Sequence, residues 1–242
     1  MGSVIVCFFI FFLKKKGKHG YFKTKNIFFQ LLRAICGSFA MFFGYSALKF
    51  INLAEASTIS FTKIFFVFFL ASIFLKEKLT LSKILLSLLG FCGVYILSSV
   101  TMSQGNIGTL MAIFGAFFVA SGIILMSYMA KDDHTLTILF YHSLFSCFLV
   151  GTFFFKNITS VSFYNIFLML IITITALVGQ YFNTESYRKN NANYIIIFSY
   201  TRILFSILFG YFFLSESLNI FQLLGLFLIV LTTMLGGRIK EI

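Results

Sequence analysis

The chain has 242 residues, of which 60% are hydrophobic and only 11% are charged, and its mean hydropathy is +0.99. A soluble domain has about 25% charged and about 45–50% apolar residues, so the composition argues against a soluble enzyme, a disordered chain and a secreted disulfide scaffold. The class that remains is an all-α polytopic membrane protein. The net charge of +12 is compatible with nucleic acid, but its distribution along the chain favours a lipid bilayer instead.

Taken in chain order, eight segments are long and apolar enough to cross a bilayer, which takes about 20 residues for a core of about 30 Å. A further apolar segment at residues 3–13 is too short to span alone. Because the connecting loops are short, we expect neighbouring helices to run antiparallel and the loops to alternate between the two sides. The predicted spans are 28–48, 54–75, 81–100, 107–130, 136–155, 161–183, 193–214 and 218–237.

The basic residues gather in every second loop. Fourteen of the 19 Lys and Arg residues lie in one set of loops, six of them between residues 14 and 25, whereas the other set holds only Lys49 and Lys156. Cytoplasmic loops carry the excess of Lys and Arg, so this bias predicts a cytoplasmic C-terminus. The expected partners are the lipid bilayer and a small-molecule substrate, with no nucleic acid.

The segment 107–130 carries a small residue at every fourth position, namely Gly108, Ala112, Ala116 and Ala120. Small residues let membrane helices approach one another closely. We interpret this face as a packing contact within the chain, and the alternative is the seam of a homodimer.

Motifs for catalysis, cofactors or metals are missing from the sequence. It has no His-Glu-x-x-His pattern and no Gly-rich phosphate loop. Its four cysteines lie in apolar runs without Cys-x-x-Cys spacing and are interpreted as packing residues. Asp132-Asp133-His134 is interpreted as a polar loop, because three consecutive residues do not all face one ion. We therefore expect a protein that is not an enzyme and has no cofactor or metal site.

An internal repeat relates two parts of the chain at an offset of 139 residues. Residues 61–79 and 200–218 are identical at 7 of 19 positions, with Lys63 opposite Arg202. The first of these helices is expected to run outside to inside and the second inside to outside. Inverted-topology repeats are typical of secondary transporters, whose site lies near the membrane midplane.

The repeat predicts two domains, an incomplete first repeat at 1–100 and a second repeat at 107–242. The offset places about 30 residues of the first repeat before Met1, so we expect this repeat to lack its first helix. Residues 3–13 are then the back half of a helix equivalent to 136–155.

The residues that carry a family resemblance in the first repeat are Arg33, Gly44 to Lys49, Leu53 to Ala56, Ser60-Phe61, Phe74 to Glu77 and Leu89 to Val94. They resemble the EamA-type repeat of the drug/metabolite transporter superfamily. The second copy is weaker but keeps Phe213 to Glu216, Leu224-Gly225 and a basic C-terminal end.

The resemblance implies ten helices as two sets of five, cytoplasmic termini in a bacterial inner (plasma) membrane, and transport of small metabolites. A narrower similarity, in Leu139-Phe140-Tyr141-His142-Ser143, points to S-adenosylmethionine uptake carriers of intracellular bacteria. The chain departs from the family at Ile64, where a proline is usual, and in the first helix, which we expect to be missing.

Lys63 and Arg202 are the leading candidates for a substrate site. Each lies about nine residues, or about 14 Å, into its predicted helix, near the midplane. A charge at that depth costs at least about 2.5–3.5 kcal/mol and usually has a function. We expect Arg202 to hold an anionic or zwitterionic metabolite as a bidentate fork and Lys63 to hold it as a point charge. The alternative is a structural pairing with Glu185 or with helix-end carbonyls.

Other polar residues in the spans are candidates for the substrate cavity. Near the inner end of one helix, we expect Gln180, Asn183 and Glu185 to line a vestibule. Glu185 is there a candidate proton carrier. The alternative is that these residues form the polar end of the helix at the membrane interface. Further candidates for polar groups in the cavity are Tyr45, Ser60 and Tyr200.

Two acids lie at helix junctions, Glu77 and Glu216. We expect each to be a first-turn acid of the helix that follows, where it suits the positive end of the helix dipole, and a gating role is the alternative. His142 is expected to bond a neighbouring helix, with a ligand or proton-relay role as the alternative. Arg33 is expected to extend to the lipid headgroups.

The function that fits these features best is a secondary transporter that works by alternating access, with S-adenosylmethionine as the specific substrate. The second hypothesis is a truncated, non-transporting remnant or an accessory membrane subunit. An integral membrane enzyme is the third.

Overall fold

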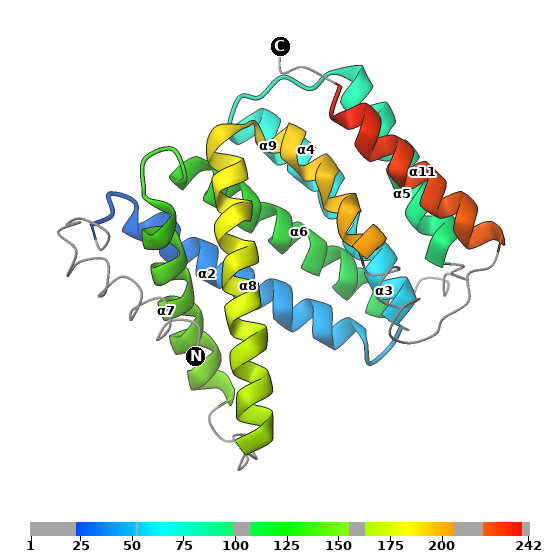
Figure 1. The fold of residues 1–242 in the computed structure, drawn as a ribbon. Helices are drawn as coiled ribbons and strands as arrows, with labels where there is room; N and C mark the ends of the chain where they lie inside the picture. Colours follow the sequence, from blue (N-terminus) through cyan, green and yellow to red (C-terminus); the bar gives the residue numbers. More distant parts are fainter. Residues whose placement is uncertain (1–22, 52, 99–106, 155–162, 206–219, 239–242) are drawn as a thin grey trace. The chain divides into compact units, whose positions relative to one another are not determined.

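The computed structural model describes residues 23–51, 53–98, 107–154, 163–205 and 220–238. All regular secondary structure within these ranges is helical, which confirms the all-α prediction for the described part of the chain (Figure 1). The elements are α2 (Ile27–Ala47), α3 (Leu53–Ser60), α4 (Lys63–Phe74), α5 (Leu81–Ser98), α6 (Ile107–Met129), α7 (Thr135–Phe154), α8 (Phe163–Lys189), α9 (Ala192–Ile195), the 3-10 helix η2 (Ile196–Tyr200) and α11 (Ile220–Gly236).

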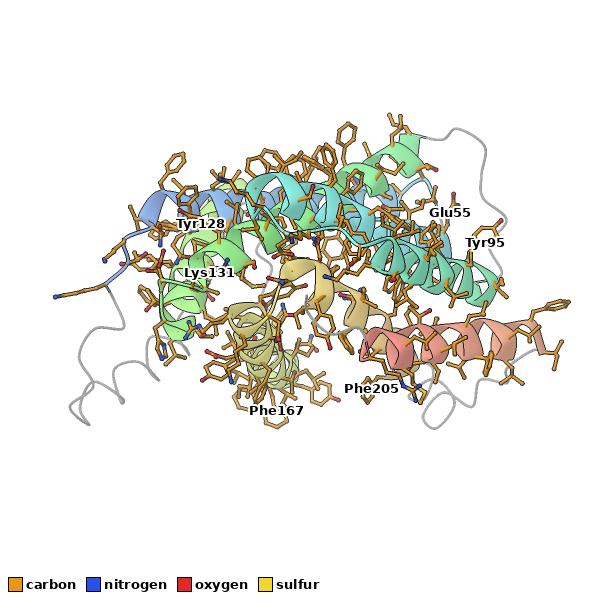
Figure 2. The ribbon with its side chains drawn as sticks, turned by 90° about the horizontal axis from the view of Figure 1, so that it is seen from above. Glu55, Tyr95, Tyr128, Lys131, Phe167 and Phe205 are labelled. Carbon is orange, nitrogen blue, oxygen red and sulfur yellow. The ribbon has the colours of Figure 1, made fainter. Side chains whose placement is uncertain are left out.

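Four helical segments within these ranges are long and apolar enough to cross a membrane, and four shorter apolar helices accompany them. Large apolar side chains cover their outer surfaces. On α8, for example, Phe167 is 55% exposed (labelled in Figure 2). Such surface is unfavourable in water and suits lipid. The four long segments are Ile27–Ala47, Glu55–Phe74, Ile107–Met129 and Phe163–Lys189.

The helix bounds agree with the predicted spans except at three places. The predicted span 54–75 is split into α3 and α4, and the predicted span 193–214 is described only to Phe205. The third difference is α8, which continues past residue 183 to Lys189. Its last turn is stabilised by basic side chains that suit the negative end of the helix dipole. The apolar segment 3–13 lies outside the described residues.

The chain packs as two compact units, whose borders fall within α2 and α6. Unit 1 is formed by the described residues up to Phe39 and those within Leu125–Lys189, and unit 2 by the described residues within Ala40–Ile124 and from Asn190 onward. These units group residues by packing, whereas the predicted repeats group them by sequence. The repeat boundaries therefore stay a prediction.

In unit 1, apolar contacts join α7 to its neighbours. Leu136 and Leu139 on α7 are buried against Leu177 and Tyr181 on α8. At the start of α7, Ile138 packs with residues from the end of α6 and the start of α2. This packing holds the ends of four helices together, and it positions the polar groups described below.

In unit 2, small residues allow two close helix crossings. A Cβ atom on Gly93 of α5 would lie 2.9 Å from the carbonyl oxygen of Gly225 on α11, so only glycine fits there. On α6, a Cβ atom at Gly108 would lie 2.7 Å from Phe50, and Ala112 is buried beside it. The small-residue face of α6 thus serves contacts within the chain at these two positions, and a homodimer seam stays a prediction.

Candidate functional site

The span that carries Lys63 is an interrupted helix. Phe61 and Thr62 form a turn between α3 and α4. The N–H groups of Phe61, Thr62, Ile64 and Phe65 each donate to the carbonyl oxygen three residues earlier, at 3.1, 2.9, 3.0 and 3.0 Å. This is 3-10 geometry, which within a helix often marks a hinge, and broken helices line substrate sites in transporters.

The helix that carries Arg202 has the same irregularity at the matching position. After α9, the 3-10 helix η2 ends at Tyr200, and helical residues continue to Phe205. Thr201 donates its hydroxyl to the carbonyl of Phe198 at 2.7 Å, and Thr62 donates to Ile59 at 2.7 Å. The two threonines lie 139 residues apart, and each is followed directly by a cationic residue, Lys63 or Arg202. The chain contains no proline, so both interruptions form without one.

Two aromatic rings stack between these helices within unit 2. The centroids of Phe61 and Tyr200 are 5.5 Å apart, with an interplanar angle of 13°. Tyr200 is fully buried, and its hydroxyl donates to the carbonyl oxygen of Ser87 on α5 at 2.8 Å. A Cβ atom on Gly90 would lie 2.5 Å from the Tyr200 ring, so the glycine makes room for the stack.

Both predicted cations lie over the same ring. The Lys63 Nζ atom is 5.4 Å from the Phe61 centroid, and the Arg202 Cζ atom is 5.6 Å from it. These distances are within the range of about 6 Å for a cation–π interaction. Lys63 is buried, whereas Arg202 is exposed. Neither has a carboxylate within 4.0 Å among the described residues, so the pair can accept an anionic group.

The two remaining candidate residues in unit 2, Ser60 and Tyr45, take less part in this arrangement. Ser60 ends α3, and its hydroxyl donates to the carbonyl of Ser57 at 2.6 Å, which satisfies it within its own helix. Tyr45 on α2 is 72% exposed. The structure thus brings together Lys63, Arg202 and Tyr200. The residue that joins them, Phe61, was not named as a site residue from the sequence. The repeat did contain a signal, because the offset of 139 residues sets Phe61 opposite Tyr200.

A buried acid in unit 2 also went unnoticed in the sequence. Glu55 on α3 is only 2% exposed, inside a segment that is apolar enough to span a membrane. The signal was present, since an acid within an apolar helix is costly and usually functional.

Glu77 differs from its predicted role. Its two carboxylate oxygens accept the N–H groups of Ala192 and Asn193 at 2.7 and 2.9 Å, so it caps α9. It lies outside the first turn of the helix that follows it, because α5 begins only at Leu81. The cause is the backbone at Lys76, whose φ of 54° turns the chain away from the axis of α4. Glu216 lies outside the described residues.

In unit 1, Glu185 belongs to a polar network at the end of α8. It forms an ion pair with Arg188 at 3.4 Å and accepts a hydrogen bond from the hydroxyl of Thr135 on α7. Arg188 also donates to the carbonyl oxygen of Asp133 at 2.6 Å. These contacts are those of a structural tie between α7 and α8. Gln180 and Asn183 are exposed on α8.

Asp133 is more than part of a polar loop. It is buried, and its carboxylate accepts hydrogen bonds from Thr24 Oγ1 at 2.5 Å and Gln30 Nε2 at 3.1 Å. No sequence pattern indicates this role, because the partners lie more than 100 residues earlier. The next residue, His134, accepts the N–H of Leu136 through Nδ1 at 3.2 Å. Among the described residues, no group of three or more His, Cys, Asp or Glu side chains is placed to hold a metal ion.

Arg33 and His142 also lie in unit 1. Arg33 does not extend to the headgroups as expected, because it is buried at 5% exposure and donates to the Sδ atom of Met126 at 3.4 Å. The imidazole of His142 packs against Gly37 of the neighbouring helix α2. The hydrogen bond that we expected for His142 is not made by its Nδ1 atom within the described residues.

Comparison with known proteins places this fold among transporters. An uncharacterized transporter of Helicobacter pylori is 30% identical over 231 residues, which cover 91% of this chain and 75% of that protein. The pseudopaline exporter CntI of Pseudomonas aeruginosa is 24% identical, over 87% of this chain and 75% of the exporter. Mouse solute carrier family 35 member G1 is 29% identical, over 75% and 54% of the respective chains.

A solved crystal structure shares the fold, with a TM-score of 0.81, 17% sequence identity, and coverage of 98% of this chain and 86% of that one. Residues 1–99 and 106–236 both match the EamA-like transporter family. The apolar helices, the interrupted spans and these sequence matches are all consistent with a membrane transporter. The chain belongs to the EamA-like transporter family and is a polytopic membrane transporter.

Proposed function

We propose that the chain is a secondary carrier that binds an anionic or zwitterionic metabolite between Lys63 and Arg202 and transports it by alternating access. The observation that carries this proposal is the pair of cations over one ring, at 5.4 and 5.6 Å from the Phe61 centroid. Two cations this close repel each other in a low-dielectric site. A bound carboxylate or phosphate removes that repulsion and forms charge-assisted hydrogen bonds with both.

The paired helix interruptions support the alternating-access mechanism. The Thr62 and Thr201 hydroxyls make matching bonds of 2.7 Å, each just before its cation. Hinges at equivalent places in two repeats let each half of a carrier rock about a central site. Inverted repeats at 1–100 and 107–242 are part of this proposal, as are the bacterial inner membrane and a cytoplasmic C-terminus.

S-adenosylmethionine is the specific substrate that the sequence resemblance suggests. Its carboxylate suits the two cations. However, its ammonium and sulfonium groups are themselves cations. We therefore expect a metabolite with a net negative charge to bind more tightly than S-adenosylmethionine.

The test is uptake by the purified chain in liposomes, with radiolabelled S-adenosylmethionine, amino acids and phosphorylated metabolites as probes. For the probe that is transported, Arg202→Met should lower uptake about 10-fold to 100-fold, because a hydrogen bond to a charged group contributes about 1.5–3 kcal/mol. The control is Lys49→Met, which removes an exposed cation at the end of α2. Unchanged uptake by Arg202→Met at normal expression contradicts the proposed site.

A further inference from the structure

Unit 1 holds a buried cation without a counter-ion among the described residues. The Arg33 side chain on α2 is 5% exposed, and its Nη2 atom donates to the Met126 sulfur at 3.4 Å. Its Nη1 atom is buried and has no hydrogen-bond partner among the described residues. A thioether is a weak acceptor, so the Nη2 group is only weakly satisfied and the two N–H donors of Nη1 are left without an acceptor there. No carboxylate within the described ranges lies within 4.0 Å of it.

A second polar group on the next helix adjoins Arg33. The Nδ1 atom of His142 on α7 is buried and has no partner among the described residues. The imidazole lies against Gly37, one turn after Arg33, where a Cβ atom would be 3.1 Å from Cε1. Because residues four apart lie on the same face of a helix, the imidazole and the Arg33 side chain lie on the same face of α2. The Met126 sulfur completes the group, and it also accepts the hydroxyl of Thr184 on α8 at 3.4 Å.

An isolated charge inside a protein is among the costliest features that a fold can carry. Buried charges are normally paired, and in a membrane bundle an unpaired one points to a ligand pathway or site. A water molecule would satisfy the donors but would leave the charge unbalanced. A small anion satisfies the donors and also balances the charge, because it accepts hydrogen bonds and neutralises the guanidinium.

We propose that Arg33 and His142 bind a compact monovalent anion, of the size of formate or chloride, where α2, α6 and α7 meet in unit 1. The limit on size comes from burial, because the Arg33 Nη1 and His142 Nδ1 atoms are both buried and an anion beside them has to be small. This site is distinct from the Lys63 and Arg202 pair, which belongs to unit 2. It does not depend on which metabolite the carrier transports.

The test is thermal unfolding of the purified full chain in detergent, with sodium formate, sodium chloride or sodium gluconate at equal sodium concentration. Gluconate is too large for the site and reports the general effect of salt. At ten times the Kd, formate and chloride should raise the unfolding midpoint of the wild type by about 3–6 °C relative to gluconate. Arg33→Met should lose this difference. In gluconate it should unfold at or above the wild-type temperature, because an apolar side chain replaces an unbalanced charge.

Three further variants make the result specific. Lys49→Met removes an exposed cation just after the same helix and should keep the anion-dependent shift. Arg202→Met should also keep it, because its cation lies in the other unit. Arg33→Lys retains the positive charge but lacks the planar guanidinium, so its anion-dependent shift in the unfolding midpoint should be smaller. This variant tests the proposal even where Arg33→Met does not fold. The proposal is overturned by equal wild-type midpoints in all three salts, by a full shift in Arg33→Met, or by loss of the shift in Arg202→Met.

Discussion

The cap that Glu77 places on α9 makes a sharp prediction about stability. Its carboxylate is the acceptor for two backbone N–H groups, those of Ala192 and Asn193, at 2.7 and 2.9 Å. Both donors lie at a helix start, where the first N–H groups have no partner within the helix. Replacing Glu77 by Ala therefore leaves two donors unpaired and removes a negative charge from the positive end of the helix dipole.

The magnitude follows from these two bonds. Loss of an N-terminal cap costs about 0.5–2 kcal/mol, and loss of the dipole interaction adds about 0.3–1 kcal/mol. Because Glu77 is partly exposed, we expect about 2 kcal/mol for Glu77→Ala. For Glu77→Gln we expect about half of this, because the amide oxygen can still accept one N–H group. For a chain of this length, about 1 kcal/mol shifts the unfolding midpoint by about 2–4 °C.

The assay is thermal unfolding of the purified chain in detergent. Glu77→Ala should unfold about 4–8 °C below the wild type, and Glu77→Gln about 2–4 °C below it. The exposed neighbour Lys78 supplies the control, since Lys78→Gln should leave the midpoint unchanged. A midpoint for Glu77→Ala equal to that of the wild type would refute the reasoning, because it would mean that the carboxylate does not stabilise α9.

Three further substitutions test other contacts. Gly93→Ala should lower the unfolding midpoint, because the new methyl group meets a backbone oxygen at 2.9 Å and such overpacking costs about 1–3 kcal/mol. The control is Gly44→Ala, whose methyl group meets nothing within 4 Å and should leave the midpoint unchanged. Equal midpoints for the two variants would contradict the close crossing of α5 and α11. Gly90→Ala should displace the ring of Tyr200 and lower liposome uptake more than it lowers the midpoint; full uptake would show that the stack is dispensable. Asp133→Ala should lower the free energy of unfolding by about 2–4 kcal/mol, because Thr24 and Gln30 lose their acceptor. The measurement is the thermal unfolding midpoint, and a loss of stability below about 0.5 kcal/mol argues against the network.

The spans and the helical class follow from the sequence, because hydropathy over about 20 residues depends on composition alone. The interruption at Phe61 does not follow from it. The segment 54–75 is apolar enough on average to be predicted as one span, and the proline that would indicate a break is replaced by Ile64. The break depends on the Thr62 hydroxyl, which bonds a carbonyl three residues back, a choice that sequence patterns seldom reveal.

The candidate site was predictable in part, for a physical reason. A charge within an apolar span is conspicuous, so Lys63 and Arg202 stood out. The Phe61 ring did not, because aromatic residues are abundant in this chain. Glu77 illustrates the other limit. Dipole arguments from sequence assign an acid to the nearest helix start, whereas its partner lies 115 residues away along the chain.

The central claim is that Lys63 and Arg202 hold the same anionic group. A double-mutant cycle on liposome uptake tests it most directly, with Lys63→Met, Arg202→Met and the double variant compared with the wild type. If both cations bind one anion, the two losses should be coupled by about 0.5–3 kcal/mol, and the double variant should be little worse than the more damaging single one. Losses that add to within about 0.5 kcal/mol would contradict the claim, because they would show that the two cations act independently.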